Sequence, residues 1–327
     1  MSALAFDHSA GIGPPAPGKI PFRTKLKAWW NGYDPLDLCP RPTPPPAITM
    51  APAAPPAALA NDATESAAAK VRVWTASRIH VVERLWGDGF HTPGGGDHIL
   101  ELVKPMALNE TMTLLDLGCG LGGGARTIAK TFNTWVTGIE WWKELAVAGV
   151  ERSTKAGMEK KAAVQFHAGD RLTLKPKSFN AIYSKEALFT VPDKANLLEV
   201  IAGALRPGGQ LCFTDYVLPT NEDPSPRIVE WQDRELAGAT PWSVEGYAIA
   251  LQALGLDLRI AEDMSERHRT LIREGWDQLQ IATEGIVISQ ETMPILIREA
   301  EIWARRMALL RKGELKHYRF FAIKPGS

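Results

Sequence analysis

The sequence has little of the features that mark several specialised classes of protein. Its 37 Lys and Arg residues are balanced by 37 Asp and Glu residues, so the net charge is zero. General nucleic-acid binders normally carry a basic excess, and this balance argues against a nucleic-acid partner. No apolar run reaches the roughly 18 residues that indicate a membrane-spanning helix. The three cysteines, Cys39, Cys119 and Cys212, are isolated and odd in number, which indicates neither a disulfide framework nor a metal site and favours a reducing, cytoplasmic setting.

Prolines are concentrated near the N-terminus. Of the 24 prolines, 13 fall in the first 56 residues. Residues 39–69 combine proline with alanine and offer few large apolar side chains, which is typical of an extended linker that cannot recover its ordering entropy. Residues 1–19 are similar, and they show no charged segment followed by an apolar one, so we expect no secretory signal. The sequence therefore predicts a disordered Pro/Ala-rich leader over residues 1–70.

One aromatic segment interrupts this leader near residues 21–33. Its apolar residues recur at helical spacing with basic residues on the flanks: Phe22, Leu26, Trp29, Trp30 and Tyr33, beside Arg23, Lys25 and Lys27. One interpretation is a short amphipathic helix that touches an anionic membrane or captures a lipid-like substrate. The other is a helix that docks on the main domain or on a second copy of the chain. The sequence leaves both open, together with the oligomeric state.

From about residue 71 the chain alternates helical and strand patterns. Strands are expected at 112–120, 133–140, 162–170, 179–187 and 209–217, and helices at 123–132, 141–157 and 195–205. Strands separated by helices of about this length predict a parallel, doubly wound α/β sheet. Further strands near 257–263 and at 317–325, the last expected at an edge, would complete seven mostly parallel strands. Helical cap elements are expected near 71–107 and 218–311, so residues 71–327 would form one domain.

The segment LLDLGCGLGGGARTIA is the strongest motif. Gly118, Gly120 and Gly123 satisfy the pattern GxGxxG directly after a predicted strand and before a predicted helix. Glycines at these positions let the backbone turn sharply and approach a ligand at the helix N-terminus. The pattern alone fits both dinucleotide sites and S-adenosylmethionine (SAM) sites.

Acidic residues at three successive strand ends distinguish a SAM site from a dinucleotide site. Asp116 ends the first strand, where its carboxylate can receive the methionine ammonium group of SAM. Glu140 ends the second strand, placed for the ribose hydroxyls, and Asp170, which follows Gly169, ends the third, placed for the adenine amino group. Ligands of such sheets bind outside the carboxyl ends of the strands. Three carboxylates there suit a cationic ligand better than a pyrophosphate, so we expect SAM.

A later segment, LRPGGQLCFTDYV, supports the same choice, because a PGG turn between a helix and a strand is characteristic of SAM-dependent methyltransferases. Over roughly residues 71–260 the sequence resembles the class I SAM-dependent methyltransferases. Within that class it is most similar to the phosphoethanolamine N-methyltransferases, with the sarcosine/dimethylglycine and sterol methyltransferases as more distant relatives. The matching segments are DLGCGLGGGA, TGIE, AGD, IYSKEALFTV, LRPGG, TDYV and WSVEGYAIALQALGL.

This resemblance implies a Rossmann-like fold and transfer of a methyl group to a small-molecule or lipid-like acceptor, foremost an amine nitrogen. Gly169 and Ser184 fall in matching segments and are expected at the cofactor. Trp141 and Trp142 follow Glu140, and one of them is expected to stack on adenine, with Trp141 favoured. The other would pack in the following helix.

The acceptor is expected beside IYSKEALFTV. Glu186 in that segment is the candidate to bind or deprotonate the acceptor, the alternative being a carboxylate that caps a helix or forms a salt bridge. His91 is the candidate base, since its loop adjoins the sulfonium end of the cofactor site in related enzymes. That loop, WGDGFHTPGGG, either closes over SAM or merely forms turns. The other six histidines show no metal spacing and are expected at the surface or in the core.

The sequence departs from the phosphoethanolamine enzymes where they bind their substrate. Thr190 stands at the place of their catalytic histidine, and Trp74 at the place of a tyrosine on the N-terminal lid helix. Ala237 and Ala239 occupy the stretch that supplies their phosphate-binding arginine and tyrosine. Burying a phosphate without a cationic partner is costly, so we expect an acceptor other than phosphoethanolamine.

An aromatic lining is expected at the acceptor site instead. Its members would be Trp74, Trp86, Phe90, Phe189, Tyr216 and Trp242. Such a lining could hold a methylated ammonium group through cation–π contacts, or a flat ring or an apolar lipid. The sequence therefore leaves C- or O-methylation of a ring or lipid as an alternative, followed by a non-catalytic SAM-binding scaffold protein and a dinucleotide dehydrogenase.

Overall fold

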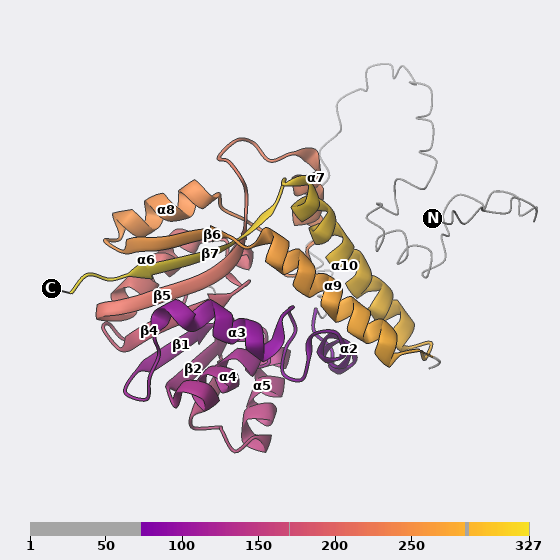
Figure 1. Ribbon diagram of the computed structural model, residues 1–327, viewed down its shortest axis with the longest axis horizontal. Helices are drawn as coiled ribbons and strands as arrows, with labels where there is room; N and C mark the ends of the chain where they lie inside the picture. The colour runs from indigo at the N-terminus through magenta and orange to yellow at the C-terminus, as the bar shows by residue number, and fades with distance from the viewer. Residues whose placement is uncertain (1–72, 170, 285–287, 327) are drawn as a thin grey trace, which may run out of the picture. The chain divides into compact units, whose positions relative to one another are not determined.

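The strands pair in the order β3-β2-β1-β4-β5-β7-β6 in a single sheet (Figure 1). The computed structural model describes residues 73–169, 171–284 and 288–326. The strands are β1 (Thr113–Leu117), β2 (Trp135–Glu140), β3 (Ala162–Phe166), β4 (Phe179–Lys185), β5 (Leu205–Val217), β6 (Asp257–Asp263) and β7 (Lys316–Ile323). The first five pair in parallel, whereas β7 is antiparallel to both of its neighbours. The predicted seven-stranded, mostly parallel α/β sheet is confirmed.

The predicted edge position of the last strand is wrong. β7 pairs with β5 on one side and with β6 on the other, so β6 and β3 form the edges. Phe320, Phe321 and Ala322 are consecutive and all buried. Successive side chains of a strand point to opposite faces, so this run shows that both faces of the sheet are covered at β7. Its interior position comes from its pairing with β5 and β6.

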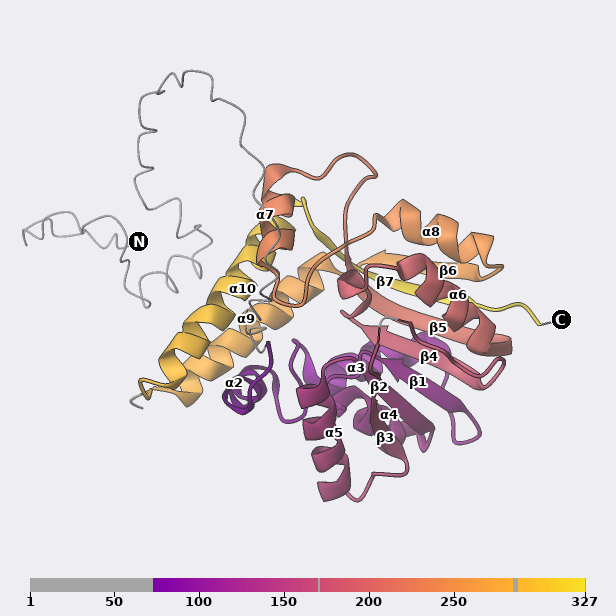
Figure 2. The same ribbon diagram turned by 180° about the vertical axis from the view of Figure 1, so that it is seen from behind.

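Helices cover both faces of the sheet (Figures 1 and 2). They are α2 (Ala76–Trp86), α3 (Gly95–Val103), α4 (Gly123–Phe132), α5 (Lys143–Lys155), α6 (Lys194–Ala204), α7 (Pro226–Arg234), α8 (Val244–Ala253), α9 (Ser265–Ala282) and α10 (Thr292–Lys312), with short turns η1 (Lys104–Met106) and η2 (Leu188–Thr190). On β1, Leu114 packs into the core beneath α3 and α4, and Leu115 into the core beneath α6 and α8. This alternation divides the hydrophobic core into two layers.

A helical cap projects beyond the sheet (Figure 2). The long helices α9 and α10 lie between β6 and β7 in the chain and pack against α2. Trp86 of α2 meets Trp276 of α9 and Trp303 of α10 edge to face, with ring centroids 6.5 and 4.7 Å apart. Aromatic pairs of this geometry add about 0.5–1.5 kcal/mol beyond burial. The cap is therefore held by its own hydrophobic cluster.

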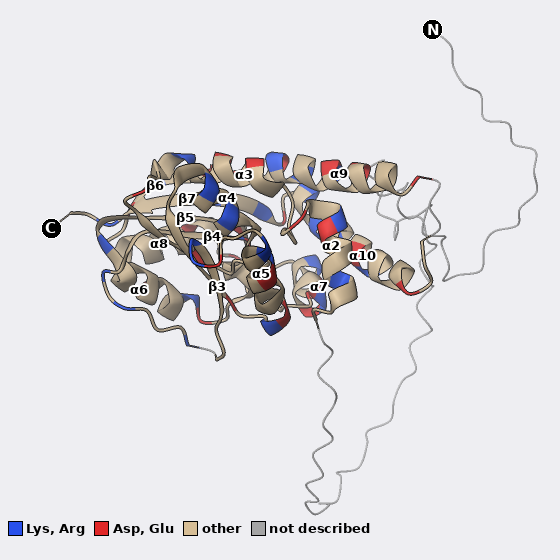
Figure 3. Cartoon of the chain, turned by 90° about the horizontal axis from the view of Figure 1, so that it is seen from below, with Lys and Arg blue, Asp and Glu red and all other residues tan. Residues whose placement is uncertain are grey.

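Charged residues are interspersed along the described helices and strands (Figure 3), in agreement with the net charge of zero. In the part of the chain that the structure describes, no helix combines the length and the apolar character needed to cross a bilayer. The predicted leader over residues 1–70, with its amphipathic helix near 21–33, lies outside the described residues.

The turn between β1 and α4 brings the glycine motif against the preceding loop. Gly120 has a left-handed φ of 56°, and a Cβ atom there would lie 2.1 and 2.3 Å from ring atoms of His91. Gly123 donates its N–H to the carbonyl of Gly89 at 3.0 Å. The segment WGDGFHTPGGG forms turns here, with left-handed φ angles at Gly87 and Gly89, and its closure over a ligand stays a prediction.

Gly120→Ala should therefore destabilise the protein more than a glycine substitution in open space. Gly157→Ala is the matched control, because Gly157 has a φ of 65° and no atom within 4 Å of an added Cβ. Both variants carry left-handed strain of about 1–2 kcal/mol. We expect Gly120→Ala to lose about 1–3 kcal/mol more from overpacking, measured by urea unfolding. Equal losses would mean that His91 does not pack against the loop.

Candidate functional site

The carboxyl ends of β1, β2 and β4 open into a cavity of about 660 Å³. Its lining joins residues expected at the cofactor to residues expected at the acceptor. The first group contributes Gly118, Glu140, Trp141 and Gly169, and the second contributes Trp74, His91, Glu186 and Phe189. Trp142, Thr190 and Ala237 line it too. One continuous space thus connects the two halves of the predicted site.

Two carboxylates are buried where the first two strands end. Asp116 and Glu140 are each only 3% exposed. The Glu140 carboxylate accepts the N–H groups of Gly120 at 2.7 Å and Trp142 at 2.9 Å. Burial nevertheless raises the pKa of Glu140 to about 7. Burial, and then the charge of Glu140, also raise the pKa of Asp116 to about 7. Neither carboxylate is fully compensated by the described protein groups, which suits a ligand that brings donors or positive charge.

The other residues expected at the cofactor are placed in different ways. Asp116, Gly120 and Gly123 lie outside the cavity lining, within or beside the turn that borders it. Ser184 also lies outside the lining, and its hydroxyl donates to the Leu117 carbonyl at 2.8 Å, joining β4 to β1. Asp170 lies outside the described residues. The cofactor contacts expected for all of them stay predictions.

His91 and Trp74 lie together in the lining. Their rings meet edge to face with centroids 5.5 Å apart. Burial and then the positive charge of Lys185 lower the pKa of His91 to about 4, so its ring is neutral at physiological pH. The Arg78 guanidinium lies 4.0 Å from the centre of the Trp74 ring.

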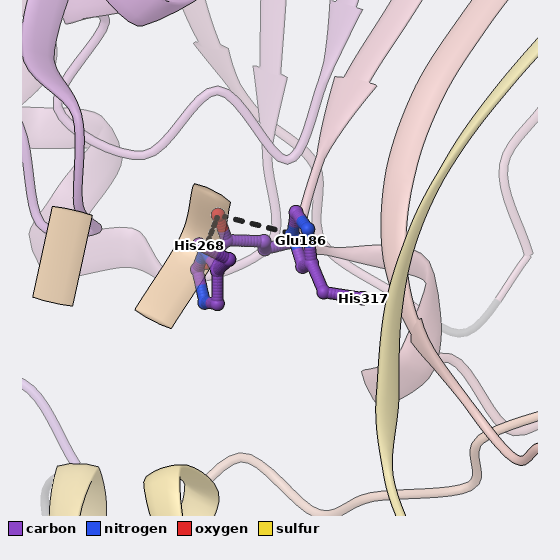
Figure 4. Close-up of side chains that lie close together, drawn as sticks. All are labelled: Glu186, His268 and His317. Atoms are coloured by element: carbon purple, nitrogen blue, oxygen red, sulfur yellow. Dashed lines mark ion pairs between the residues drawn. The ribbon is translucent and has the colours of Figure 1, made fainter. Parts of the chain in front are cut away.

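Glu186 lies at the end of β4 and contacts groups from three elements (Figure 4). Its Oε1 accepts a hydrogen bond from Lys185 Nζ at 2.7 Å. His268 Nδ1 of α9 and His317 Nε2 of β7 lie 3.8 and 3.6 Å from the same oxygen. Oε2 has no hydrogen-bond partner among the described residues. Burial alone would raise the pKa of Glu186, but Lys185, followed by His268 and His317, outweighs it and holds the pKa well below its usual range.

These three side chains carry donor atoms of the kind that bind metals. The donor atoms of Glu186, His268 and His317 all lie within 4.8 Å of one another. The two imidazoles, however, are stacked, with centroids 3.9 Å apart and planes inclined by 5°. An imidazole nitrogen binds a metal in its ring plane at about 2.0–2.1 Å. A single ion cannot lie in both of two stacked planes, so this arrangement does not suit coordination of one ion. At 3.6 and 3.8 Å from Oε1, the imidazole nitrogens make close polar contacts with Glu186 and no hydrogen bond to it.

Three cationic side chains line the cavity, which corrects the expectation that it lacks partners for an anion. They are Arg78, Lys185 and Arg306. Each faces a carboxylate: Arg78 Nε lies 2.5 Å from Glu299, Lys185 pairs with Glu186, and Arg306 binds Glu235 through Nε at 3.1 Å and a terminal nitrogen at 2.7 Å. The positive charges of the described lining are thus neutralised within the protein.

The expected aromatic lining is right for Trp74 and Phe189 and wrong for the other four residues. Trp86 lies in the cap cluster, and Phe90 packs against the α3/α4 core. Tyr216 is fully buried, and Trp242 packs against the α6/α8 core. Trp303 of α10 lines the cavity in their place. The protein's own arginines already cover its aromatic rings, since Arg306 lies 4.8 Å from the centre of the Trp303 ring.

The sequence did not predict that four residues lie at the site: His268, His317, Arg78 and Arg306. The two histidines are buried in the core, which was one of the two places expected for them, but they contact the carboxylate of Glu186, the candidate to bind the acceptor. They come from α9 and β7, and the arginines from α2 and α10. No motif links these elements to β4, and only the packing of the cap brings them together.

Comparison with known proteins agrees with this architecture. Phosphoethanolamine N-methyltransferase 1 of Zea mays is 28% identical over 255 residues, which cover 77% of this chain and 49% of that protein. Phosphoethanolamine N-methyltransferase 2 of Haemonchus contortus, solved with phosphomonomethylethanolamine and S-adenosylhomocysteine, superposes with a TM-score of 0.66 at 23% identity, over 78% of this chain and 59% of that one. A putative sarcosine dimethylglycine methyltransferase from Galdieria sulphuraria gives a TM-score of 0.64 at 16% identity, over 77% and 98%.

The chain spans about half the length of the plant proteins that it matches. The structural similarities are below 25% identity and show the shared fold. A family model described as a methyltransferase domain matches residues 108–275, slightly more than half of the chain. That region contains β1 to β6 and the glycine turn. The chain therefore belongs to the methyltransferase domain family.

Proposed function

We propose that this protein transfers a methyl group from SAM to an amine nitrogen of a small-molecule or lipid-like acceptor. The observation that carries the proposal is the single cavity lined both by Gly118 and Glu140, at the strand ends expected to hold SAM, and by Glu186. In-line transfer needs donor and acceptor held in one enclosed space. The related phosphoethanolamine N-methyltransferases support an amine as the acceptor.

The residues at the sheet edge fit SAM. SAM, when bound, supplies a methyl group on a sulfonium centre for direct displacement. Asp116 would receive the ammonium group, Glu140 the ribose hydroxyls, and Trp141 the adenine ring, with Asp170 expected at the adenine amino group. The structural support for this assignment is the pair of buried carboxylates at Asp116 and Glu140, whose raised pKa values report missing donors or positive charge. A dinucleotide pyrophosphate would add negative charge beside them.

The acceptor half of the cavity favours a cation. Apart from Glu140, which is assigned to the cofactor, the described lining carries four carboxylates, Glu186, Asp193, Glu235 and Glu299, against the three cations Arg78, Lys185 and Arg306. Glu186 lines this space and would bind an acceptor N–H through its carboxylate. His91 is neutral and lines the same space. A pKa of about 4 makes its ring a weak base, so the proton that an ammonium acceptor loses before attack would pass through the ring to solvent and would not stay on it.

We propose an amine other than phosphoethanolamine as the acceptor. Thr190 and Ala237 line the cavity at positions where those enzymes are expected to carry functional side chains. The cations of the lining already face carboxylates of their own. A phosphate would have to displace one of these pairs, and leaving a buried carboxylate unpaired is costly.

C- or O-methylation of a ring or lipid is the second candidate. It is favoured by the apolar part of the lining, to which Trp74, Phe189, Ile302 and Trp303 contribute. A non-catalytic SAM-binding protein would show binding without turnover. We further propose a cytoplasmic location, supported by Cys119 and Cys212, which are free and buried.

Glu186→Gln should abolish most methyl transfer without weakening SAM binding. The amide keeps the shape of the side chain but loses the charge that orients an ammonium acceptor. We expect a loss of about 100-fold or more in the rate, measured with methyl-labelled SAM and a panel of amines that includes phosphoethanolamine, sarcosine and dimethylglycine. Glu199→Gln, on an exposed position of α6, is the control and should keep full activity. Full activity of Glu186→Gln would remove Glu186 from the mechanism.

SAM binding should release protons below pH 7. Without ligand, Asp116 and Glu140 have pKa values of about 7 and are mostly protonated at pH 6. The ammonium and hydroxyl groups of SAM favour the ionised carboxylates, which lowers both pKa values in the complex. Affinity should therefore rise with pH from about 5 to about 7, where the free carboxylates ionise.

Calorimetry at pH 6 in two buffers of different ionisation enthalpy measures this release. Asp116→Asn should release fewer protons than the unmodified protein, because one titrating group is gone. Binding without proton release, at an affinity that does not change between pH 5 and 7, would contradict the placement of SAM beside these carboxylates.

A further inference from the structure

A buried polar cluster lies behind Glu186, on the side away from the cavity lining. His268 is 1% exposed and His317 is fully buried, and neither lines the cavity. Tyr216 of β5 completes the cluster, with its hydroxyl 2.7 Å from His268 Nε2. Burying several polar side chains is costly unless their hydrogen bonds are satisfied. The cluster therefore calls for an explanation beyond packing.

The direction of the hydrogen bonds follows from the charges. Burial, followed by the neighbouring His317, holds the pKa of His268 well below its usual range, so its ring is neutral and carries one proton. A proton on Nε2 would leave the lone pair of Nδ1 facing the Glu186 carboxylate at 3.8 Å. With the Tyr216 hydroxyl donating to Nε2, the ring proton instead lies on Nδ1 and faces that carboxylate. Tyr216 thus fixes the tautomer of His268.

His317 approaches the same oxygen from the opposite edge of the cluster. Its Nε2 lies 3.6 Å from Glu186 Oε1, and its ring stacks on that of His268 at 3.9 Å. With Lys185 Nζ at 2.7 Å, three nitrogen groups surround Oε1. Figure 4 shows the three labelled side chains pointing toward one another from separate elements. Among the described residues, Oε2 has no hydrogen-bond partner, and neither do His268 Nδ1 and the two ring nitrogens of His317, so the histidines act on Oε1 through close polar contact.

The backbone of Glu186 also needs this support. Its φ of 53° is left-handed, which is rare for a residue with a long side chain. Such strain persists only where the surroundings over-determine the conformation, and it concentrates at functional sites. The groups that fix the side chain from Oε1 oppose any rotation that would relieve the strain.

We propose that His268 and His317 are positioning residues, which hold Oε1 of Glu186 from behind and thereby fix its carboxylate at the lining of the cavity. This rests on the proposed function only for the identity of what Glu186 binds. Lys185 of β4 and the two histidines are the nearest charged or titratable groups. Beyond them lie Tyr183 of β4, Tyr216 of β5, His91, His98 of α3 and Arg306 of α10. His268 and His317 do not form a metal site with Glu186, because one ion cannot lie in the planes of two stacked rings.

The ionisation of Glu186 tests the proposal without any acceptor. We would label the full chain with ¹³C at the glutamate carboxyl carbons, assign Glu186 from the signal lost in Glu186→Gln, and follow it with pH. His268→Leu and His317→Leu should each raise the titration midpoint of Glu186 by about one pH unit or more. His268→Asn and His317→Gln keep an N–H near the lost donor and should restore most of the shift. His80→Leu, at an exposed position of α2, should leave the midpoint unchanged.

Two further measurements distinguish failure of the proposal from misfolding of the leucine variants and from metal binding at the cluster. Tyr216→Phe preserves the packing and frees the His268 tautomer, so it should raise the midpoint by a smaller amount even if the leucine variants do not fold. Metal analysis should find no metal ion that is stoichiometric in the unmodified protein and lost in His317→Leu. An unchanged midpoint in the folded variants, or a stoichiometric ion at the cluster, would overturn the proposal. A shifted midpoint in a protein that transfers no methyl group would instead overturn the proposed function alone.

Discussion

The burial of negative charge at the carboxyl edge of the sheet governs the rest of this site. Asp116, Glu140 and Glu186 are all buried where parallel strands end. Moving a carboxylate out of water is costly unless donors or positive charge replace the lost hydration. The protein compensates Glu186 with its own Lys185 and two histidines. The burial of Asp116 and Glu140 is only partly compensated by the described residues. That part of the sheet edge therefore suits a ligand that carries donors and positive charge.

The same constraint shapes the acceptor half of the cavity. Arginines from α2 and α10 stack on aromatic rings and pair with buried glutamates. Their charges are therefore committed to the fold, and the described lining keeps an excess of carboxylates.

The sheet could be predicted from the sequence because its information is local. The alternation of apolar strands with helices, the GxGxxG turn and the acids at Asp116 and Glu140 are each read within a short window, and the structure places them together. The edge position of 317–325 could not be predicted correctly, because pairing on both sides of β7 depends on a chain reversal after two long helices. His268 and His317 could not be connected to Glu186 for the same reason. Their approach depends on how α9 and β7 pack, which no local pattern encodes.

The product of turnover with methyl-labelled SAM tests the central claim most directly. The full chain would be incubated with labelled SAM and the small-molecule fraction of a cell extract, and the labelled product would be located atom by atom by fragmentation mass spectrometry. The account predicts the label on a nitrogen atom of an amine. Label on carbon or oxygen would contradict the amine acceptor, and the absence of any labelled product despite SAM binding would contradict methyl transfer itself.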